Sequence, residues 1–328
     1  MRILNLIDFK MTKIENFDVV IIGGSYAGLS AALSLGRALR KIIVIDSGNP
    51  SNEQTPHSHN FLTRDGETPA QLSKKAREEV LRYPSVTFKK DRVVAVTGEN
   101  RNFKVQTEEK AMFSASKIIF STGVIDIIPE IAGFAECWGI SILHCPYCHG
   151  YEHKNLPTGV FANGQAGYDQ AKFISNWTKD LVLYTDGKST LDDEQTAGLK
   201  RRNIPIVEKE IEGFEHSSGK IKAIVYKDGN KQALNVLYAL PEVKQQSELP
   251  CELCCEFTDH GRIDVDLFHK TTVDGIYAAG DNSSMGRAIA VAVAAGSVAG
   301  AMINKELIEE EFSKGINIGN PDLVNQDK

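Results

Sequence analysis

The sequence predicts an α/β protein built from two Rossmann-like nucleotide-binding domains, the second inserted into the first. Two observations lead to this prediction. A glycine-rich turn at residues 23–28 joins a buried apolar strand to an alanine-rich helix, and a second copy of the pattern follows 139 residues later. A length of 328 residues accommodates two domains of ordinary size. The expected bounds are 1–126 and 243–328 for the first domain and 127–242 for the inserted one.

The first copy begins with a continuous apolar run at 17–22, which is typical of a parallel strand covered on both faces. A helix to about residue 39 and a second buried strand at 41–45 complete a βαβ unit and imply a parallel sheet. The alternating pattern of 86–123 predicts antiparallel strands that return to a buried strand.

The second copy has a strand at 158–162, a helix at 168–177 and a strand at 181–184. Gly167 aligns with Gly28, and Gly164 with Ser25. Residues 204–240 repeat the alternating pattern, so antiparallel strands are expected there too. A polar linker at 241–250, a buried strand at 271–281 and an alanine-rich helix complete the expected fold.

Composition excludes several classes of protein. Thirty-seven basic against 43 acidic residues leave no excess to hold a nucleic-acid backbone, and six cysteines are too few for a disulfide scaffold. The apolar stretch 288–303 is shorter than the roughly 20 residues that span a membrane. Residues 1–16 interrupt their apolar run with polar side chains, unlike a secretion signal, and Met11 is an alternative start. A cytoplasmic protein with a loose polar tail from 314 is expected.

The first turn has the sequence Gly23-Gly24-Ser25-Tyr26-Ala27-Gly28, with serine at the middle position of the GxGxxG pattern. Glycines allow the backbone to approach a pyrophosphate at the helix N-terminus. Asp46 ends the next strand, where an acid hydrogen-bonds ribose hydroxyls. This context favours dinucleotide binding over an ordinary helix-packing turn.

The second turn matches the GxGxxG pattern less well. Ala162 replaces the first glycine, Thr185 stands where the acid is expected, and Lys188 is the one nearby cation. A degenerate copy that keeps its fold and a working NADPH or NADH site both remain open.

The segment His144-Cys145-Pro146-Tyr147-Cys148-His149 predicts reversible dithiol–disulfide chemistry at the start of a helix. An adjacent imidazole can transfer the proton that the thiolates exchange. A zinc site shared with Cys251, Cys254 and Cys255 is the alternative, but about a hundred residues separate the two groups, against the usual 15–20. No metal site is therefore predicted, and Cys137 is expected to be a core thiol.

Three further segments supply candidate cofactor contacts. His59 and Asn60 follow the Asp46 strand, where His57 and His59 either line a cofactor ring or cap the loop. Gly280 and Asp281 end a buried strand. Arg287, Ala288 and Ile289 open the alanine-rich helix, whose N-terminus favours a reduced, anionic ring.

These motifs together resemble the low-molecular-weight thioredoxin-reductase-like flavoproteins over about residues 17–312. The resemblance rests on IIGGSYAGLSAA, STG at 121–123, CPYCHGYE and GIYAAGDNSSMGRAIAVAVAAG. It implies FAD held by the first domain and a homodimer. It further implies pyrophosphate contacts from Gly23, Ser25, Ala27, Gly28 and Gly123, a ribose contact from Asp46, a ribityl–phosphate contact from Asp281 and an isoalloxazine contact from Arg287–Ile289.

The same resemblance implies that Cys148 lies against the flavin and that Cys145 attacks the partner's disulfide, with His149 as acid/base in place of the usual aspartate. The family's NADPH motif is absent from the second turn. A thioredoxin-like protein is the favoured partner. The alternatives are a dithiol oxidase that acts on a small molecule with O2, a ferredoxin-type reductase and a flavin redox sensor.

Overall fold

The computed structural model describes residues 14–313, so the expectations for the N-terminal segment and for the tail from 314 fall outside the described residues. Backbone contacts divide the chain into two compact units. The first holds the residues up to Asn49, Ser73–Gly123 and those from Gln245; the second holds Pro50–Leu72 and Val124–Lys244. The expected bounds placed 50–72 in the first domain, whereas the contacts of this segment are with the second unit.

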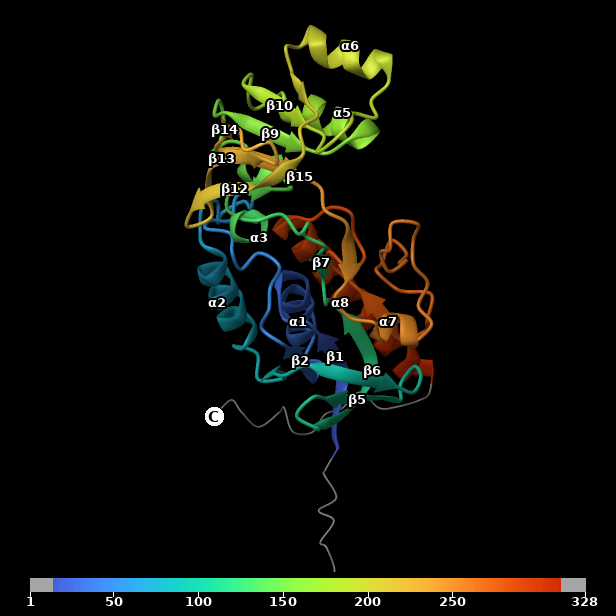
Figure 1. Cartoon of the computed structure of the whole chain (residues 1–328). Helices are drawn as coiled ribbons and strands as arrows, with labels where there is room; N and C mark the ends of the chain where they lie inside the picture. Colours follow the sequence, from blue (N-terminus) through green and yellow to red (C-terminus); the bar gives the residue numbers. More distant parts are fainter. Residues whose placement is uncertain (1–13, 314–328) are drawn as a thin grey trace, which may run out of the picture. The chain divides into compact units, whose positions relative to one another are not determined.

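The first unit contains a seven-stranded sheet in the order β3-β2-β1-β6-β5-β4, in which β17 also pairs with β6 (Figure 1). Strands β3, β2, β1, β6 and β17 run parallel, which fits their continuous apolar sequences. The elements are β1 (Glu15–Ile22), α1 (Tyr26–Arg37), β2 (Ile42–Asp46), α2 (Pro69–Val80), β3 (Val86–Lys90), β4 (Val93–Thr97), β5 (Phe103–Thr107), β6 (Met112–Phe120), α7 (Leu249–Glu252), β17 (Ile276–Ala278) and α8 (Ile289–Ser313).

Helices α1 and α8 pack together through small residues. A Cβ atom built on Gly296 would lie 2.0 Å from the Ala27 carbonyl oxygen, and one on Gly300 would lie 2.8 Å from that of Ala31. Such close approach explains the glycine and alanine content of α8. By length and composition α8 is the one described helix apolar enough to cross a membrane, but its buried face belongs to the core of the first unit.

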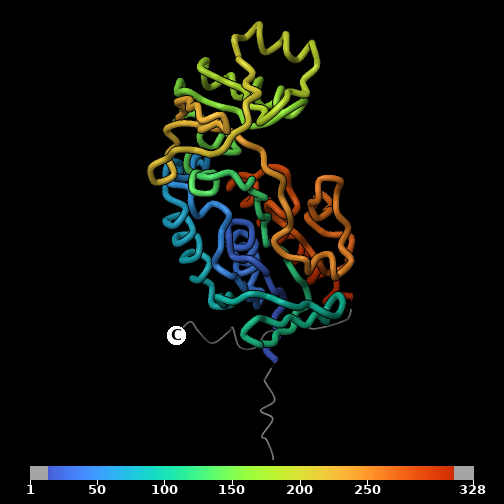
Figure 2. Tube along the Cα trace, in the orientation of Figure 1, coloured from blue at the N-terminus to red at the C-terminus, as the bar shows by residue number. Residues whose placement is uncertain are grey.

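The second unit contains a five-stranded parallel sheet in the order β11-β10-β9-β15-β8. Figure 2 follows residues 124–244 of this unit from green to yellow. A separate three-stranded antiparallel sheet, β12-β13-β14, accompanies it. The elements are β7 (Val124–Asp126), α3 (Phe134–Cys137), β8 (Ile142–Leu143), α4 (Pro146–His149), β9 (Thr158–Phe161), α5 (Gly164–Ile174), β10 (Leu181–Tyr184), α6 (Asp193–Arg201), β11 (Ile206–Val207), β12 (Ile211–Ser217), β13 (Lys220–Tyr226), β14 (Lys231–Ala233), β15 (Val236–Ala239) and β16 (Val243–Gln245).

Both alternating regions are mixed rather than wholly antiparallel. Strands β4, β5 and β6 are antiparallel as expected, but β3 is parallel to β2. The chain turns between β3 and β4 because the buried carboxylate of Asp91 accepts a hydrogen bond from the Arg92 amide at 2.8 Å and pairs with Lys89. In the second unit β11 likewise runs parallel to β10.

Two other expectations are corrected by local hydrogen bonds. The strand expected over 271–281 is reduced to β17, because the Thr271 hydroxyl donates to the Ile276 carbonyl at 3.0 Å and folds the chain into a turn. The expected linker at 241–250 contains β16, which pairs with β7, and the start of α7.

Candidate functional site

The first glycine turn brings the start of α1 directly onto the ends of the parallel strands. Gly23 has φ +105°, and its amide donates to the Ile45 carbonyl at 2.8 Å. A Cβ atom on Gly28 would lie 2.0 Å from the Gly23 carbonyl oxygen, and one on Gly23 would lie 2.3 Å from that of Ser121. Neither position has room for a side chain.

The N-terminus of α1 has no side-chain cap within the described part of the chain. Ser25 occupies the N-cap position but makes no capping hydrogen bond, and the first turn carries no acid. The backbone N–H groups of this turn therefore remain available to an anion, and the helix dipole favours negative charge there.

Asp46 is tied to the same turn. Its Oδ1 atom accepts a hydrogen bond from the Gly24 amide at 2.9 Å, and a Cβ atom on Gly24 would lie 2.8 Å from the Cβ of Asp46. Oδ2 lies 3.9 Å from the guanidinium of Arg77, which stacks over Phe88. This places a fixed carboxylate beside the glycine turn, as a ribose contact requires.

The segment after β6 adds polar groups to the turn. The Ser121 hydroxyl donates to the Gly23 carbonyl at 2.8 Å. The Thr122 hydroxyl is buried without a hydrogen-bond partner in the structure. Gly123 has φ +69°, and a Cβ atom there would meet open space. The exposed face of this segment fits a ligand that supplies the missing polar partner.

The segment after β17 reaches the same strand end. Gly280 has φ +98°, and a Cβ atom on it would lie 3.1 Å from Ala27. Asn282 donates to the Phe120 carbonyl at 2.9 Å, while its buried Oδ1 atom has no partner. Asp281 lies 3.4 Å from Arg287, which precedes α8. Ala288 and Ile289 then begin that helix.

The first unit thus fits a dinucleotide. Glycines that leave no room for side chains, an uncapped helix N-terminus, a carboxylate and two unpaired buried polar atoms are found around the carboxyl ends of parallel strands. Ala27 lies on the buried face of α1 in the same turn.

The second unit carries the redox pair. Cys145 and Cys148 form a disulfide with a Cα–Cα distance of 5.3 Å. Cys145 is the N-cap of α4, and Pro146 occupies its first turn. The expected start of a helix at this motif is confirmed, and both cysteines remain partly exposed.

His149 follows the redox pair directly in the sequence, and three other histidines act on it. Burial, and after it repulsion from His144, His153 and His59 when these are protonated, lowers the pKa of His149 to about 4. His149 is therefore neutral at physiological pH. Burial also lowers the pKa of His153.

His59 and Asn60 lie in the second unit beside this group. The Nδ1 atom of His59 is 3.6 Å from carboxylate oxygens of both Asp65 and Glu152. The Asn60 amide donates to Asp65 at 2.7 Å. His57 Nδ1 is 3.0 Å from the Gly66 carbonyl oxygen. Whether His59 and Asn60 also contact the cofactor depends on both units together and stays a prediction.

The second glycine turn is closed by its own side chains. Asn163 Oδ1 accepts hydrogen bonds from the amides of Gly164 at 2.8 Å and Thr190 at 2.9 Å, and its Nδ2 donates to the Lys188 carbonyl at 2.9 Å. Thr185 donates to the Gly187 carbonyl, and Asp186 accepts from the amide of Ile211. Asn163, Thr185 and Asp186 are therefore already hydrogen-bonded within the second unit.

The other cysteines are free thiols. Cys137 is buried, as expected, and burial raises its pKa. Cys255 is buried beside the Thr271 hydroxyl, whereas Cys251 and Cys254 are exposed. Within residues 14–313, no group of three or more histidine, cysteine or acidic side chains is placed to hold a metal ion.

A dinucleotide cradle in one unit and a Cys-x-x-Cys disulfide in a second Rossmann-like unit define a two-domain disulfide oxidoreductase. The chain belongs to the pyridine nucleotide-disulphide oxidoreductase family, whose model matches residues 17–297. Within that family it is a thioredoxin reductase-like, FAD-dependent oxidoreductase. The resemblance and the fold class inferred from the motifs are confirmed, and so is FAD as the cofactor.

The similar proteins support this assignment over nearly their whole length. Thioredoxin reductase tcpT of Claviceps purpurea is 33% identical, over 89% of this chain and 95% of that protein. Thioredoxin reductase aclD of Aspergillus oryzae is 28% identical, over 91% and 98%. The crystal structure of an oxidoreductase from Agrobacterium tumefaciens is 35% identical with a TM-score of 0.84, over 90% and 99%.

Several residues of this site were missed by sequence reasoning. Ser121 meets the first turn because β6 pairs with β1, and Asn282 reaches the Phe120 carbonyl because β17 pairs with β6. Arg77 reaches Asp46 from α2. The signal for Asn282 was present as a polar residue after a buried strand. Nothing in the sequence indicated the ties that Asn163 makes.

Proposed function

We propose that this protein performs thiol–disulfide exchange at the Cys145–Cys148 pair and passes the electrons to or from FAD. The partly exposed Cys145–Cys148 disulfide is the observation that supports the proposal best. Thiol–disulfide exchange requires that an attacking thiolate can reach one of the two sulfurs, which a fully buried structural disulfide would not allow.

In the oxidative direction a substrate thiolate attacks Cys145 Sγ. A substrate–Cys145 bond forms, the Cys145–Cys148 bond breaks, and Cys148 leaves as a thiolate. The second substrate thiolate then attacks the substrate sulfur of the mixed disulfide, which forms the product disulfide and releases Cys145. Two electrons pass to the cysteine pair, and two protons leave the substrate thiols. Both protons pass to the surrounding water, because the lowered pKa of His149 makes its imidazole a weak base.

The first unit would hold FAD through its own groups. The amides at the start of α1 bind the pyrophosphate, and Gly23 and Gly28 admit it. Asp46 binds the ribose, while Thr122 and Asn282 offer their unpaired oxygens. Bound FAD supplies a two-electron carrier between the cysteine pair and an external acceptor.

The acceptor is the finer part of the proposal. The second turn favours dithiol oxidation over reduction by NADPH or NADH, because Asn163 and Asp186 are already hydrogen-bonded within the unit and Thr185 stands where an acid is expected. O2 then takes up two electrons and two protons to give hydrogen peroxide. Reduction of a thioredoxin-like protein, with electrons from a ferredoxin-type donor, is the second candidate, and the curated relatives named thioredoxin reductase favour it.

Anaerobic mixing tests these alternatives. NADPH, NADH, reduced ferredoxin and dithiothreitol are added in turn to the flavin-loaded enzyme, and bleaching of the visible flavin band is followed. We expect dithiothreitol to bleach the wild type and to fail with Cys148→Ser, while the exposed free thiol variant Cys251→Ser behaves as wild type. Equal bleaching in all three proteins would refute the assigned pair. Rapid bleaching by NADPH would reject the oxidase direction.

Turnover distinguishes an enzyme from a redox sensor. In air, each substrate disulfide formed should be matched by one hydrogen peroxide. A single reduction without repeated turnover, with any dithiol or with a thioredoxin-like disulfide, would favour the sensor.

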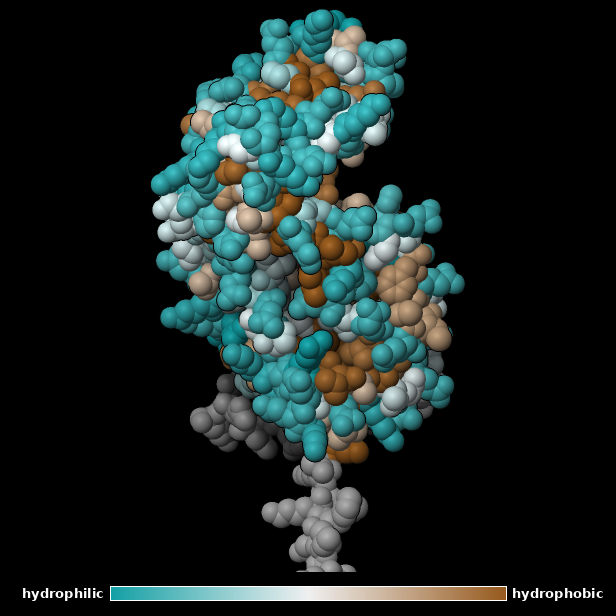
Figure 3. Space-filling model, in the orientation of Figure 1, coloured by the Kyte–Doolittle hydropathy of each residue, from teal (hydrophilic) through white to brown (hydrophobic). Residues whose placement is uncertain are grey.

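We also propose a homodimer through the first unit. Helix α8 exposes apolar side chains, among them Val291 at 39% and Val298 at 38%, and Met285 before it is 63% exposed. Figure 3 shows a mostly polar face on which apolar side chains gather in separate patches. Sedimentation should give a dimer in the wild type and a monomer in Val298→Lys; a monomeric wild type would contradict the proposal.

A further inference from the structure

An aromatic pocket lies in the same unit as the redox disulfide, and one of its lining residues, Tyr147, belongs to the Cys145–Cys148 segment. It has a volume of about 510 Å³ and is lined by Tyr147, Asp169, Lys172, Phe173, Asn176 and Trp177. Tyr147 stands between the two cysteines in the sequence, and the other residues come from α5 and the segment that follows it. Gly150, which follows α4, also lies against Trp177, so the Cys-x-x-Cys segment packs on the residues that line the pocket.

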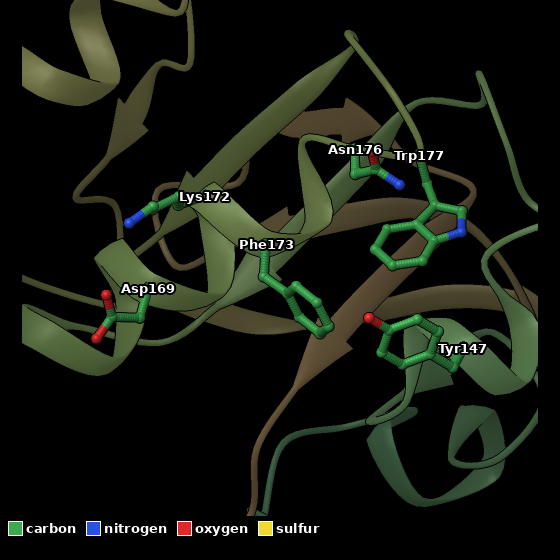
Figure 4. Close-up of a pocket in the computed structure, with 6 residues that line it drawn as sticks. All are labelled: Tyr147, Asp169, Lys172, Phe173, Asn176 and Trp177. Carbon is green, nitrogen blue, oxygen red and sulfur yellow. The ribbon is translucent and has the colours of Figure 1, made fainter.

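Three rings form the apolar wall. The ring centroids of Tyr147, Phe173 and Trp177 are 5.5–5.6 Å apart, each pair in an edge-to-face arrangement. Figure 4 shows the three rings pointing toward one another. This geometry leaves ring faces and edges available to a further planar group.

One ring is anchored and two are exposed. A Cβ atom on Gly150 would lie 2.6 Å from the Trp177 indole, so this ring packs on the backbone that ends α4. Tyr147 and Phe173 are 64% and 40% exposed. Tyr147 and Phe173 therefore keep ring surface that a ligand can contact.

The polar rim offers both hydrogen-bond donors and acceptors. Asp169, Lys172 and Asn176 lie at positions i, i+3 and i+7 along α5 and its end, on the same face as Phe173. Lysine donates, aspartate accepts and asparagine does both. The rim therefore suits an uncharged polar group, such as an amide, on an otherwise apolar molecule.

We propose that this pocket binds the ring-bearing part of a small-molecule dithiol or of its disulfide, and so sets substrate selectivity; this rests on the proposed function. Its volume falls within the roughly 300–1,000 Å³ of small-molecule sites. Held there, the substrate presents its sulfurs next to Cys145, which raises their effective concentration. The exchange then follows the sulfur balance given above.

Two dithiols test the selectivity. Dithiothreitol has no ring, whereas 1,2-benzenedimethanethiol places two thiols on a benzene ring. The quantity measured is the ratio of kcat/KM for the ring-bearing dithiol to that for dithiothreitol. In Phe173→Ala we expect this ratio to fall at least tenfold, through a higher KM for the ring-bearing dithiol. In the matched control Phe268→Ala, an aromatic residue 51% exposed in the first unit, the ratio should stay at the wild-type value.

A binding measurement separates the pocket from the chemistry. The chain has two tryptophans, so Trp138→Phe leaves Trp177 as the fluorescent reporter. The unreactive diol 1,2-benzenedimethanol should shift its emission saturably, and addition of Phe173→Ala should abolish the shift. If no dithiol turns over but the diol still binds, the proposed function fails and the pocket stands.

Two results would overturn the pocket proposal itself. One is an unchanged selectivity ratio in Phe173→Ala together with no diol binding in the Trp138→Phe protein. The other is a Phe173→Ala protein that loses turnover with a thioredoxin-like protein while keeping the wild-type ratio for the two dithiols, because the face would then be a protein-docking surface.

Discussion

The two glycine turns of this protein share a strand–turn–helix frame but differ in what closes the helix N-terminus. In the first unit Ser25 makes no cap, and the position before it is Gly24, which allows Asp46 to approach. In the second unit the corresponding position is Asn163, whose side chain caps α5 and binds the loop at 188–190. One turn is left open to a ligand, and the other is satisfied by the chain itself.

This difference shows that two turns with the same strand–turn–helix frame can use their polar groups differently. The parallel sheet of the second unit positions α4 and α5, and these carry the redox pair and residues of the aromatic pocket.

The largest effect is expected from adding one methyl group to each turn. Gly28→Ala places a Cβ 2.0 Å from a backbone carbonyl, whereas in Gly167→Ala the nearest atom is 2.9 Å away. We expect Gly28→Ala to lower the free energy of unfolding by roughly 3 kcal/mol or more and to abolish flavin retention. The ratio of visible to protein absorbance after purification measures this. Gly167→Ala should keep its flavin. Equal flavin loss in both variants would contradict the assignment of the flavin site to the first turn.

Acid pH should lower the free energy of unfolding through His149 in the second unit. The pKa of His149 is about 4 when folded and about 6.5 when unfolded, so the unfolded chain binds more protons between these values. The contribution of His149 to the free energy of unfolding is full above pH 6.5. It falls by about 2–3 kcal/mol as the pH is lowered toward 4. The difference between the urea midpoints at pH 7 and pH 4.5 should be smaller in His149→Gln than in the wild type. A variant with the same pH dependence as wild type would reject the assignment.

The two turns also show what the local sequence could predict. The first glycine turn, Asp46 beside it and the helix at the Cys-x-x-Cys motif depend on residues within one βαβ unit or one turn. Their spacing in the sequence therefore predicted their positions correctly. The segment 50–72 was placed with the wrong unit because its partners, such as Glu152, lie about ninety residues away.

The parts that sequence reasoning missed depend on distant pairing. Asn282 meets Phe120 across the β6–β17 pair, and Trp177 reaches Gly150 only after α5 packs on its sheet. A hydrogen bond such as that from Thr190 to Asn163 cannot be read from the pattern, because a polar turn residue is equally consistent with an open site.

The two aspartates near the turns should differ sharply. Asp46→Ala removes the carboxylate that faces the first turn, and a hydrogen bond to a charged group contributes about 2 kcal/mol, or roughly thirtyfold in the Kd of FAD. Asp186→Ala instead removes an acceptor for the Ile211 amide and should leave FAD binding unchanged. Titration of apoprotein with FAD measures both. Comparable losses of FAD affinity in the two variants would show that Asp186 also contributes to FAD binding.

The smallest effect is expected at the residue that closes the second turn. Asn163→Ala removes a helix cap and the ties to Thr190 and Lys188, which should destabilise the protein by about 1–2 kcal/mol. A thermal melt at saturating FAD measures this. Flavin reduction by NADPH should stay as slow as in wild type, because Thr185 and Asp186 remain bonded elsewhere and no acid faces a ribose. Rapid reduction by NADPH in this variant would mean that a single side chain had been blocking a working site.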